Sequence, residues 1–236
     1  MPASLIMGLY EKPWQAVRSR IATAARAAGR DPAEVALLAV SKAFPAEAIR
    51  AAYALGQRSF GENYVQEAVA KIALLGDLHE LQWHLIGPLQ SNKARLAAQY
   101  FAWVHSVDRQ KIAERLSAMR DEEARPLNVC VQVNISGEAS KAGVAPAEAL
   151  ALATSIARLP RLRLRGFMGI AEPTPEAQRQ RAQFRILREL CERGRAAGLS
   201  LDTLSMGMSA DLEAAIAEGA TLVRVGTALF GARPMT

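Results

Sequence analysis

The sequence predicts an α/β protein built as a single (β/α)8 TIM barrel. Short apolar runs, each about as long as a buried strand, alternate along the chain with longer segments of helical periodicity. Strands that are separated by helices pair in parallel through right-handed crossovers. Eight such units within 236 residues are the number that closes a barrel of this kind. An open, doubly wound sheet is the alternative fold.

The individual elements follow from the same alternation. An extra N-terminal helix is expected over about residues 10–29, where Trp14, Val17 and Ile21 recur at helical spacing and Pro13 lies near the start. Strands are expected at residues 35–41, 58–61, 81–87, 101–107, 127–134, 162–169, 203–206 and 221–226. Helices are expected between them at residues 45–55, 62–75, 91–99, 108–124, 146–158, 175–197 and 209–218. No linker-like segment divides the chain, so residues 1–236 are expected to form one domain.

The composition narrows the classes of function. A net charge of +6 favours anionic ligands, but the basic residues are scattered and no nucleic-acid-binding motif accompanies them. Cys130 and Cys191 have apolar sequence neighbours, which predicts that they are buried thiols rather than metal ligands. The chain shows no apolar stretch of about 18 residues and no secretory signal. We therefore expect a cytoplasmic protein without a metal, a membrane segment or a nucleic-acid partner.

Lys42 is the first candidate functional residue. It follows the strongly apolar run that ends at Val40, with Ser41 between them. Functional residues of such barrels cluster on the loops after the carboxyl ends of the strands, so we expect Lys42 at that rim. If desolvation lowers its pKa, its amine becomes a nucleophile that can form an imine with an aldehyde. The alternative is a solvated lysine just past a strand.

The segments after the seventh and eighth expected strands resemble a cradle for a phosphate group. Ser209 is expected to be the N-cap of the helix at residues 209–218, with its hydroxyl facing an anion. Gly226 and Thr227 open a short final turn in which backbone N–H groups can approach an oxyanion. TIM barrels often bind phosphate at these two loops. A serine cap and a glycine turn without any ligand are the alternative.

A phosphate site beside a strand-end lysine fits a phosphorylated aldehyde, and pyridoxal 5'-phosphate (PLP) meets both conditions. A sugar-phosphate aldolase or isomerase would meet them too. Arg224 lies on the last expected strand, two residues before Gly226, where it could face a ring nitrogen or instead pair with a carboxylate. Because an arginine stays positively charged, it would keep a pyridine nitrogen unprotonated and weaken the ring as an electron sink.

Six ordered motifs resemble the pyridoxal-phosphate-binding homeostasis protein family. They extend over about residues 10–233, and their number and order make the resemblance specific. The motifs are LLAVSKAFP at 37–45, GENYVQE at 61–67, WHLIGPLQSNK at 83–93, VNISGEASKAG at 133–143, GFMGI at 166–170 and LSMGMSADLEAAIAEGATLVRVGTALFG at 204–231.

The resemblance implies a barrel of the alanine racemase N-terminal-domain type that holds PLP as a Schiff base. Lys42 would carry the Schiff base, and the last two loops would bind the phosphate. Lys141 resembles the loop lysine that lies near the site in the family, with a solvated role as the alternative. The cofactor-binding residues that the resemblance implies are Lys42, Asn63, His84, Met206, Ser209, Arg224, Gly226 and Thr227. For His84, a histidine packed beside the pocket without contact to the cofactor is the alternative.

Two features bear on whether the protein is an enzyme. Many relatives carry a second lysine two positions after the Schiff-base lysine, where this chain has Phe44, so any role of that second lysine is in doubt here. Alanine racemases add a β domain with a catalytic tyrosine, whereas this sequence ends at Thr236, and no group opposite Lys42 except Tyr64 suggests an acid or base. We expect a monomeric PLP carrier with no catalytic residue, which serves PLP homeostasis and has apo forms of PLP-dependent enzymes as candidate recipients. A racemase-like enzyme acting on amino acids is the alternative.

Overall fold

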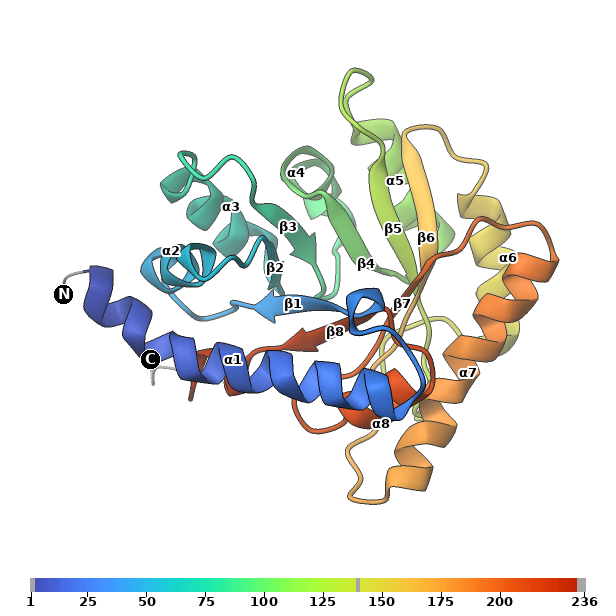
Figure 1. The fold of residues 1–236 in the computed structure, drawn as a ribbon. Helices are drawn as coiled ribbons and strands as arrows, with labels where there is room; N and C mark the ends of the chain where they lie inside the picture. The colour runs from blue at the N-terminus through green and yellow to red at the C-terminus, as the bar shows by residue number, and fades with distance from the viewer. Residues whose placement is uncertain (1–2, 139–140, 233–236) are drawn as a thin grey trace.

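Eight parallel strands close into a barrel in which each strand pairs with its neighbours in chain order (Figure 1). The structure is a computed structural model that describes residues 3–138 and 141–232. All eight expected strands and the barrel closure are confirmed. The strands are β1 (Ala36–Val40), β2 (Ser59–Glu62), β3 (Gln82–Leu85), β4 (Trp103–Val107), β5 (Leu127–Gln132), β6 (Leu162–Met168), β7 (Thr203–Ser205) and β8 (Leu222–Val225).

Helices surround the barrel and connect consecutive strands, as Figure 1 shows. Their buried faces carry small and aliphatic residues, as α2 does with Ala48, Ile49 and Ala52. The helices are α1 (Ala3–Ala27), α2 (Ala46–Ala54), α3 (Val65–Leu74), α4 (Ala94–Tyr100), α5 (Gln110–Met119), α6 (Pro146–Ile156), α7 (Ala177–Ala196), α8 (Leu212–Ala217) and α9 (Thr227–Phe230), with short 3-10 turns η1 (Pro32–Glu34) and η2 (Ser91–Lys93). Among the helices of these described segments, none is both long and apolar enough to cross a membrane.

Helix α1 begins earlier than the sequence indicated. It starts at Ala3 rather than near Tyr10, so Pro13 lies inside the helix and not in its first turn. A proline removes one intrahelical hydrogen bond, yet the helix continues across Pro13, and aromatic residues on both sides of it are anchored. The ring of Trp14 packs edge-on against Phe230 at 5.1 Å, and Tyr10 packs against the same ring at 5.6 Å. These contacts fix α1 along the outside of the barrel beside α8 and α9.

The register of the strands determines which side chains face the barrel interior. Leu38 pairs with Arg224, and Gly61 pairs with His84, which in turn pairs with Trp103. Because paired residues point to the same face of a sheet and successive residues alternate, these side chains share the inner face. The barrel interior therefore contains polar side chains below the rim on which the strand ends and their loops lie.

Candidate functional site

A cavity of about 300 Å³ opens at the rim formed by the carboxyl ends of the strands. Loops after β1, β2, β3, β6, β7 and β8 contribute to it. Six of the eight residues predicted from the sequence meet there, which are Lys42, Asn63, Ser209, Arg224, Gly226 and Thr227. The remaining lining residues, which the sequence did not indicate, are Val40, Ile86, Ile170, Met208 and Ala210.

A larger hollow of about 460 Å³ lies on the outer surface between α1 and α8. Its lining is mostly alanine, and its charged residues Arg20 and Glu213 bind each other through two hydrogen bonds of 2.9 and 3.0 Å. The rim cavity instead combines cationic and hydroxyl groups, so we assign the site to the rim.

Buried ionic groups clamp the backbone on both sides of Lys42. The Lys71 ammonium on α3 donates to the carbonyl of Ser41 at 2.9 Å. It also pairs with Glu62 at 2.8 Å and Glu67 at 2.7 Å. The Glu67 carboxylate in turn accepts the backbone N–H of Ala43 at 2.8 Å. The residues before and after Lys42 are therefore each tied to the same ammonium–carboxylate cluster.

This clamp holds a backbone turn that is unusual for its residue type. Ala43 has a φ of 64°, in the left-handed region that L-residues other than glycine, asparagine and aspartate seldom adopt. The Glu62 side chain is fully buried, and burial raises the pKa of its carboxyl group although Lys71 and Ser41 act in the opposite direction. The sequence did not reveal the clamp. The i,i+4 spacing of Glu67 and Lys71 on a helix was its only local signal.

The loop after β7 presents Ser209 to the cavity by a different local structure than expected. Helix α8 begins at Leu212, and its N-cap is Asp211 rather than Ser209. The Asp211 carboxylate accepts the backbone N–H of Met208 at 2.5 Å, which closes a turn over residues 208–211 and delays the helix. Arg20 of α1 donates to the carbonyl of Ser209 at 3.1 Å and fixes the turn from outside. The prediction of Ser209 as a helix cap was wrong, although its place on the cavity wall stands.

Arg224 forms the polar floor of the cavity. Its side chain is almost fully buried, and its guanidinium donates to the carbonyl and the hydroxyl of Ser205 and to the carbonyl of Gly169. Burial lowers the pKa of Arg224 to about 10, which still leaves it charged at neutral pH. The charge of Asp211 acts in the opposite direction on the pKa of Arg224, and burial raises the pKa of the Asp211 carboxyl group. The acceptors that hold Arg224 are thus neutral groups.

His84 and Met206 do not line the cavity. His84 points into the barrel interior, where its Nδ1 lies 2.9 Å from Nε2 of His105 and its ring stacks on Trp103. Met206 is completely buried, and Met208, two residues later, lines the cavity in its place. The prediction that these two residues line the cavity fails because a motif at a strand end does not specify how deep in the barrel each side chain lies.

Phe44, which replaces the second lysine of many relatives, belongs to an aromatic cluster. Its ring is buried and stacks on Phe230 at 5.0 Å with an angle of 29° between the planes. Phe230 also contacts Trp14 of α1, so Phe44 joins the loop after β1 to α9 and α1. In this chain the position therefore serves packing.

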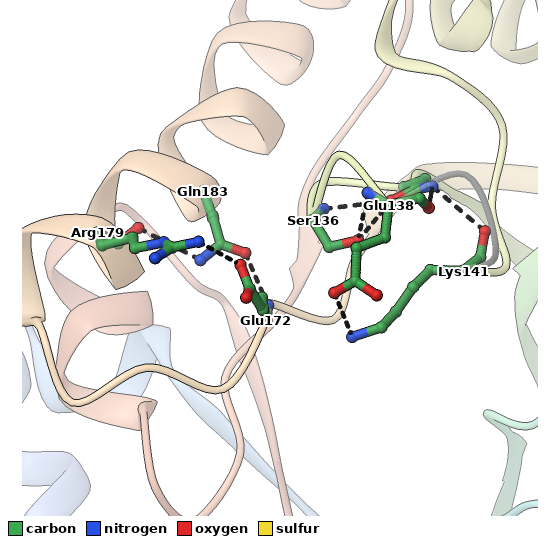
Figure 2. A network of polar contacts seen from close by, with 7 residues as sticks. Ser136, Glu138, Lys141, Glu172, Arg179 and Gln183 are labelled. Atoms are coloured by element: carbon green, nitrogen blue, oxygen red, sulfur yellow. Dashed lines mark hydrogen bonds and ion pairs between the residues drawn. The ribbon is translucent and has the colours of Figure 1, made fainter.

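Lys141 lies on the loop after β5, outside the cavity lining. Its ammonium pairs with Glu138 at 3.2 Å (Figure 2). Within the same loop, Asn134 accepts a hydrogen bond from the hydroxyl of Ser136. Figure 2 also shows the neighbouring loop after β6, where Glu172 pairs with Arg179 at 2.7 Å. The loop after β5 is thus closed by its own contacts, and the loop after β6 is tied to α7.

The lining matches the parts of a phosphorylated aromatic aldehyde. Ile86 and Ile170 offer apolar surface to a flat ring, while the hydroxyls of Ser209 and Thr227 offer donors to an anion. Gly226 lies so close to the next strand that an added Cβ would approach the carbonyl oxygen of Val40 to 3.2 Å. Its lack of a side chain leaves room for a ligand group against the backbone. Lys42 supplies an amine on the same cavity wall.

The fold and the site define the class of barrel that forms the N-terminal domain of alanine racemases. The family model described as "Alanine racemase, N-terminal domain" matches residues 14–234. An alanine racemase of Clostridium difficile 630 superposes with a TM-score of 0.69 over 86% of this chain and 53% of its own. At 15% identity, that similarity shows the shared fold alone.

Closer relatives identify the particular family. A pyridoxal phosphate homeostasis protein of Pseudomonas aeruginosa PAO1 is 63% identical over 92% of this chain and 93% of its own length. PipY of Synechococcus elongatus PCC7942, in a structure with PLP bound, is 46% identical with a TM-score of 0.78 and covers 89% of this chain and 100% of its own. The chain belongs to the pyridoxal phosphate homeostasis protein family, as the motifs indicated.

Proposed function

We propose that this protein binds PLP in the rim cavity as a Schiff base on Lys42 and that it buffers and delivers the cofactor in PLP homeostasis. The observation that carries the proposal is the convergence of Lys42, Arg224 and the hydroxyls of Ser209 and Thr227 on one cavity. The PLP-bound structure of PipY and the name of the Pseudomonas relative support it.

Each group on the cavity wall takes a defined part. The unprotonated amine of Lys42 attacks the aldehyde carbon, and one water molecule leaves as the Schiff base forms. Ser209, Thr227 and the backbone at Gly226 bind the phosphate, and Arg224 lies at the ring nitrogen. Asn63 lies beside the ring, where the absence of a side chain at Gly87 lets that glycine pack against the Asn63 backbone. When bound, PLP supplies an aldehyde that condenses reversibly with amines, which is the chemistry that a delivery protein needs.

Arg224 favours delivery over catalysis. A positive charge that is held by neutral acceptors discourages protonation of a pyridine nitrogen beside it. An unprotonated ring withdraws electrons less strongly, so it stabilises a carbanion less well. Reversible binding at Lys42 does not need that stabilisation, whereas amino-acid racemisation does.

The finer parts of the proposal concern partners and location. We propose that apo forms of PLP-dependent enzymes receive the cofactor by attack of their own lysine on the bound aldehyde carbon, which returns the Lys42 amine. We further propose that the protein acts in the cytoplasm as a monomer. Size-exclusion chromatography with light scattering tests the monomer.

The experiment mixes purified protein with PLP and then with an apo-enzyme that depends on PLP. We expect a visible absorption band on mixing and gain of activity by the recipient. In a parallel sample the loaded protein is incubated with L-amino acids in deuterated water, and we expect no rapid exchange of the α-proton. Rapid exchange would favour the racemase-like alternative, and absence of the visible band would contradict PLP binding.

A further inference from the structure

A chain of buried polar side chains runs from the cavity floor across the barrel interior. The guanidinium of Arg224 donates to the hydroxyl of Ser205 at 2.8 Å. Oγ of Ser205 lies 2.8 Å from Nδ1 of His105, and Nε2 of His105 lies 2.9 Å from Nδ1 of His84. All four side chains are at least nine-tenths buried, so these contacts form away from solvent.

The first donor is fixed, and we assign to the remaining hydrogen bonds the direction that uses the hydroxyl proton of Ser205. An arginine has no acceptor, so Oγ of Ser205 must accept from Arg224. The single hydroxyl proton of Ser205 can then go to Nδ1 of His105. That nitrogen becomes an acceptor, and His105 carries its proton on Nε2 and donates to Nδ1 of His84. The proton of His84 is left on Nε2, which has no hydrogen-bond partner among the described residues.

Both histidines remain neutral, so Arg224 carries the only charge among these four hydrogen-bonded side chains. Burial lowers the pKa of His84 to about 3. Burial also lowers the pKa of His105, and His84 and Arg224 add to the effect. A carboxylate in place of Ser205 would neutralise the guanidinium, whereas a serine backed by two neutral histidines orients it without cancelling its charge.

We propose that Ser205, His105 and His84 are positioning residues that fix Arg224 against the ring nitrogen of bound PLP and thereby keep that nitrogen unprotonated. The inference rests on the proposed function and deepens it. Its physical basis is that a serine hydroxyl rotates freely unless its proton has an acceptor. His105 supplies the acceptor only while His84 accepts the proton on the other side of the ring.

The first test compares two buried serines. Ser205→Ala removes the link, and Ser106→Ala is the matched control, because Ser106 is buried on β4 and its hydroxyl has no hydrogen-bond partner among the described residues. PLP labelled with 15N at the ring nitrogen is bound to each variant. We expect Ser205→Ala to weaken PLP retention about tenfold, as for one lost charged hydrogen bond. We also expect it to move the ring 15N signal towards the protonated form as the pH falls.

The controls are expected to separate positioning from stability. Ser106→Ala should keep wild-type retention and the wild-type ring 15N signal, and Ser205→Thr should restore both because it keeps the hydroxyl. Unchanged retention and signal in Ser205→Ala would overturn the positioning role while leaving the proposed function in place. Failure of the wild-type protein to take up PLP would overturn the proposed function and this inference together.

The second test needs no ligand. The chain contains three histidines, and 15N spectra of labelled imidazoles report the protonation state and tautomer of each. We expect His84 and His105 to stay neutral between pH 5 and 8 with the proton on Nε2. An Nδ1–H tautomer at His105, or titration of either buried ring in that range, would contradict the proposed series of hydrogen bonds from Arg224 to His84, whether or not PLP binds.

Discussion

Arg165 and Arg224 lie at opposite ends of the barrel and are held in opposite ways. Arg165, near the amino ends of the strands, pairs with Asp202 through Nε at 2.8 Å and lies over the ring of Trp103 at 4.6 Å. Burial would raise the pKa of Asp202, but the hydrogen bonds from Arg165 and Thr203 outweigh it and lower the pKa. Arg224, near the carboxyl ends, is held by the carbonyls and the hydroxyl of neutral groups.

The difference indicates what each end of the barrel does. A charge that is already matched by a carboxylate and an aromatic face stabilises the fold and offers little to a ligand. A buried charge held by neutral acceptors beside a cavity keeps its field available to whatever binds there. Arg165 at the amino end is therefore structural, whereas Arg224 at the carboxyl end is available to an anionic, aromatic ligand.

The largest effect is expected from the clamp on the rim, which is the cluster of Lys71, Glu62 and Glu67. In this cluster a cation is paired with carboxylates, as Arg165 is paired with Asp202. Lys71→Met leaves the buried Glu62 without its cation and should cost about 3–5 kcal/mol of unfolding free energy, as for other broken buried pairs. Urea denaturation measures the loss, and the exposed Lys111→Met is the control. A loss no larger than that of Lys111→Met would show that the clamp does not support the turn at Lys42.

Exchanging each arginine for methionine tests the comparison directly. Arg224→Met should weaken PLP retention about 10- to 100-fold, since a hydrogen bond from a charged group contributes about 1.5–3 kcal/mol. Arg165→Met should leave retention within about twofold and lower stability by about 1–2 kcal/mol, because its partner Asp202 is half-exposed. Spectral titration with PLP and denaturation give the two numbers. Equal losses of retention in both variants would contradict the division between the two ends.

Acid should weaken the fold through the neutral histidines below Arg224. Unfolded histidines take up protons below about pH 6.5, whereas folded His84 does so only near its pKa of about 3. The unfolded state therefore binds more protons in this window, and stability falls as pH drops from about 6.5 to 3 by up to about 1.4 kcal/mol per pH unit per histidine. His84→Gln should reduce this slope. The same slope in the variant and the wild-type protein would contradict a neutral buried His84.

The smallest effects are expected at the hydroxyls of the rim. Ser209→Ala and Thr227→Val should each weaken PLP binding by roughly 2- to 10-fold, because each removes one hydrogen bond of about 0.5–1.5 kcal/mol. Binding of pyridoxal, which has no phosphate, should stay unchanged in both variants. Titrations with the two aldehydes measure the discrimination. An equal loss for both aldehydes would remove these hydroxyls from the phosphate site.

The barrel and most of the cavity could be predicted from the sequence. Apolar strands and amphipathic helices alternate eight times, and parallel strands bring their carboxyl ends to one rim, so Lys42, Asn63 and Arg224 had to meet. The resemblance to a known family gave the ligand class. The depth of His84 could not be predicted, because it depends on the register and tilt of neighbouring strands rather than on its own segment.

Contacts between distant segments explain the remaining differences. The clamp depends on Lys71 reaching back from a helix to the carbonyl of Ser41, a contact that no motif encodes. Ser205 and His105 lie on different strands, a hundred residues apart, and their hydrogen bond exists only in the closed barrel. Asp211, and not Ser209, is the N-cap of α8. Its carboxylate accepts the backbone N–H of Met208, and this hydrogen bond competes with the local preference for a serine cap.

The central claim is that the amine of Lys42 holds PLP at the carboxyl end of the barrel. Borohydride reduction of the PLP-loaded protein, followed by proteolysis and mass spectrometry, identifies the modified lysine. We predict one dominant adduct on Lys42, and its disappearance in a Lys42→Ala variant that still folds. A dominant adduct on another lysine, such as Lys71 or Lys141, would contradict the claim.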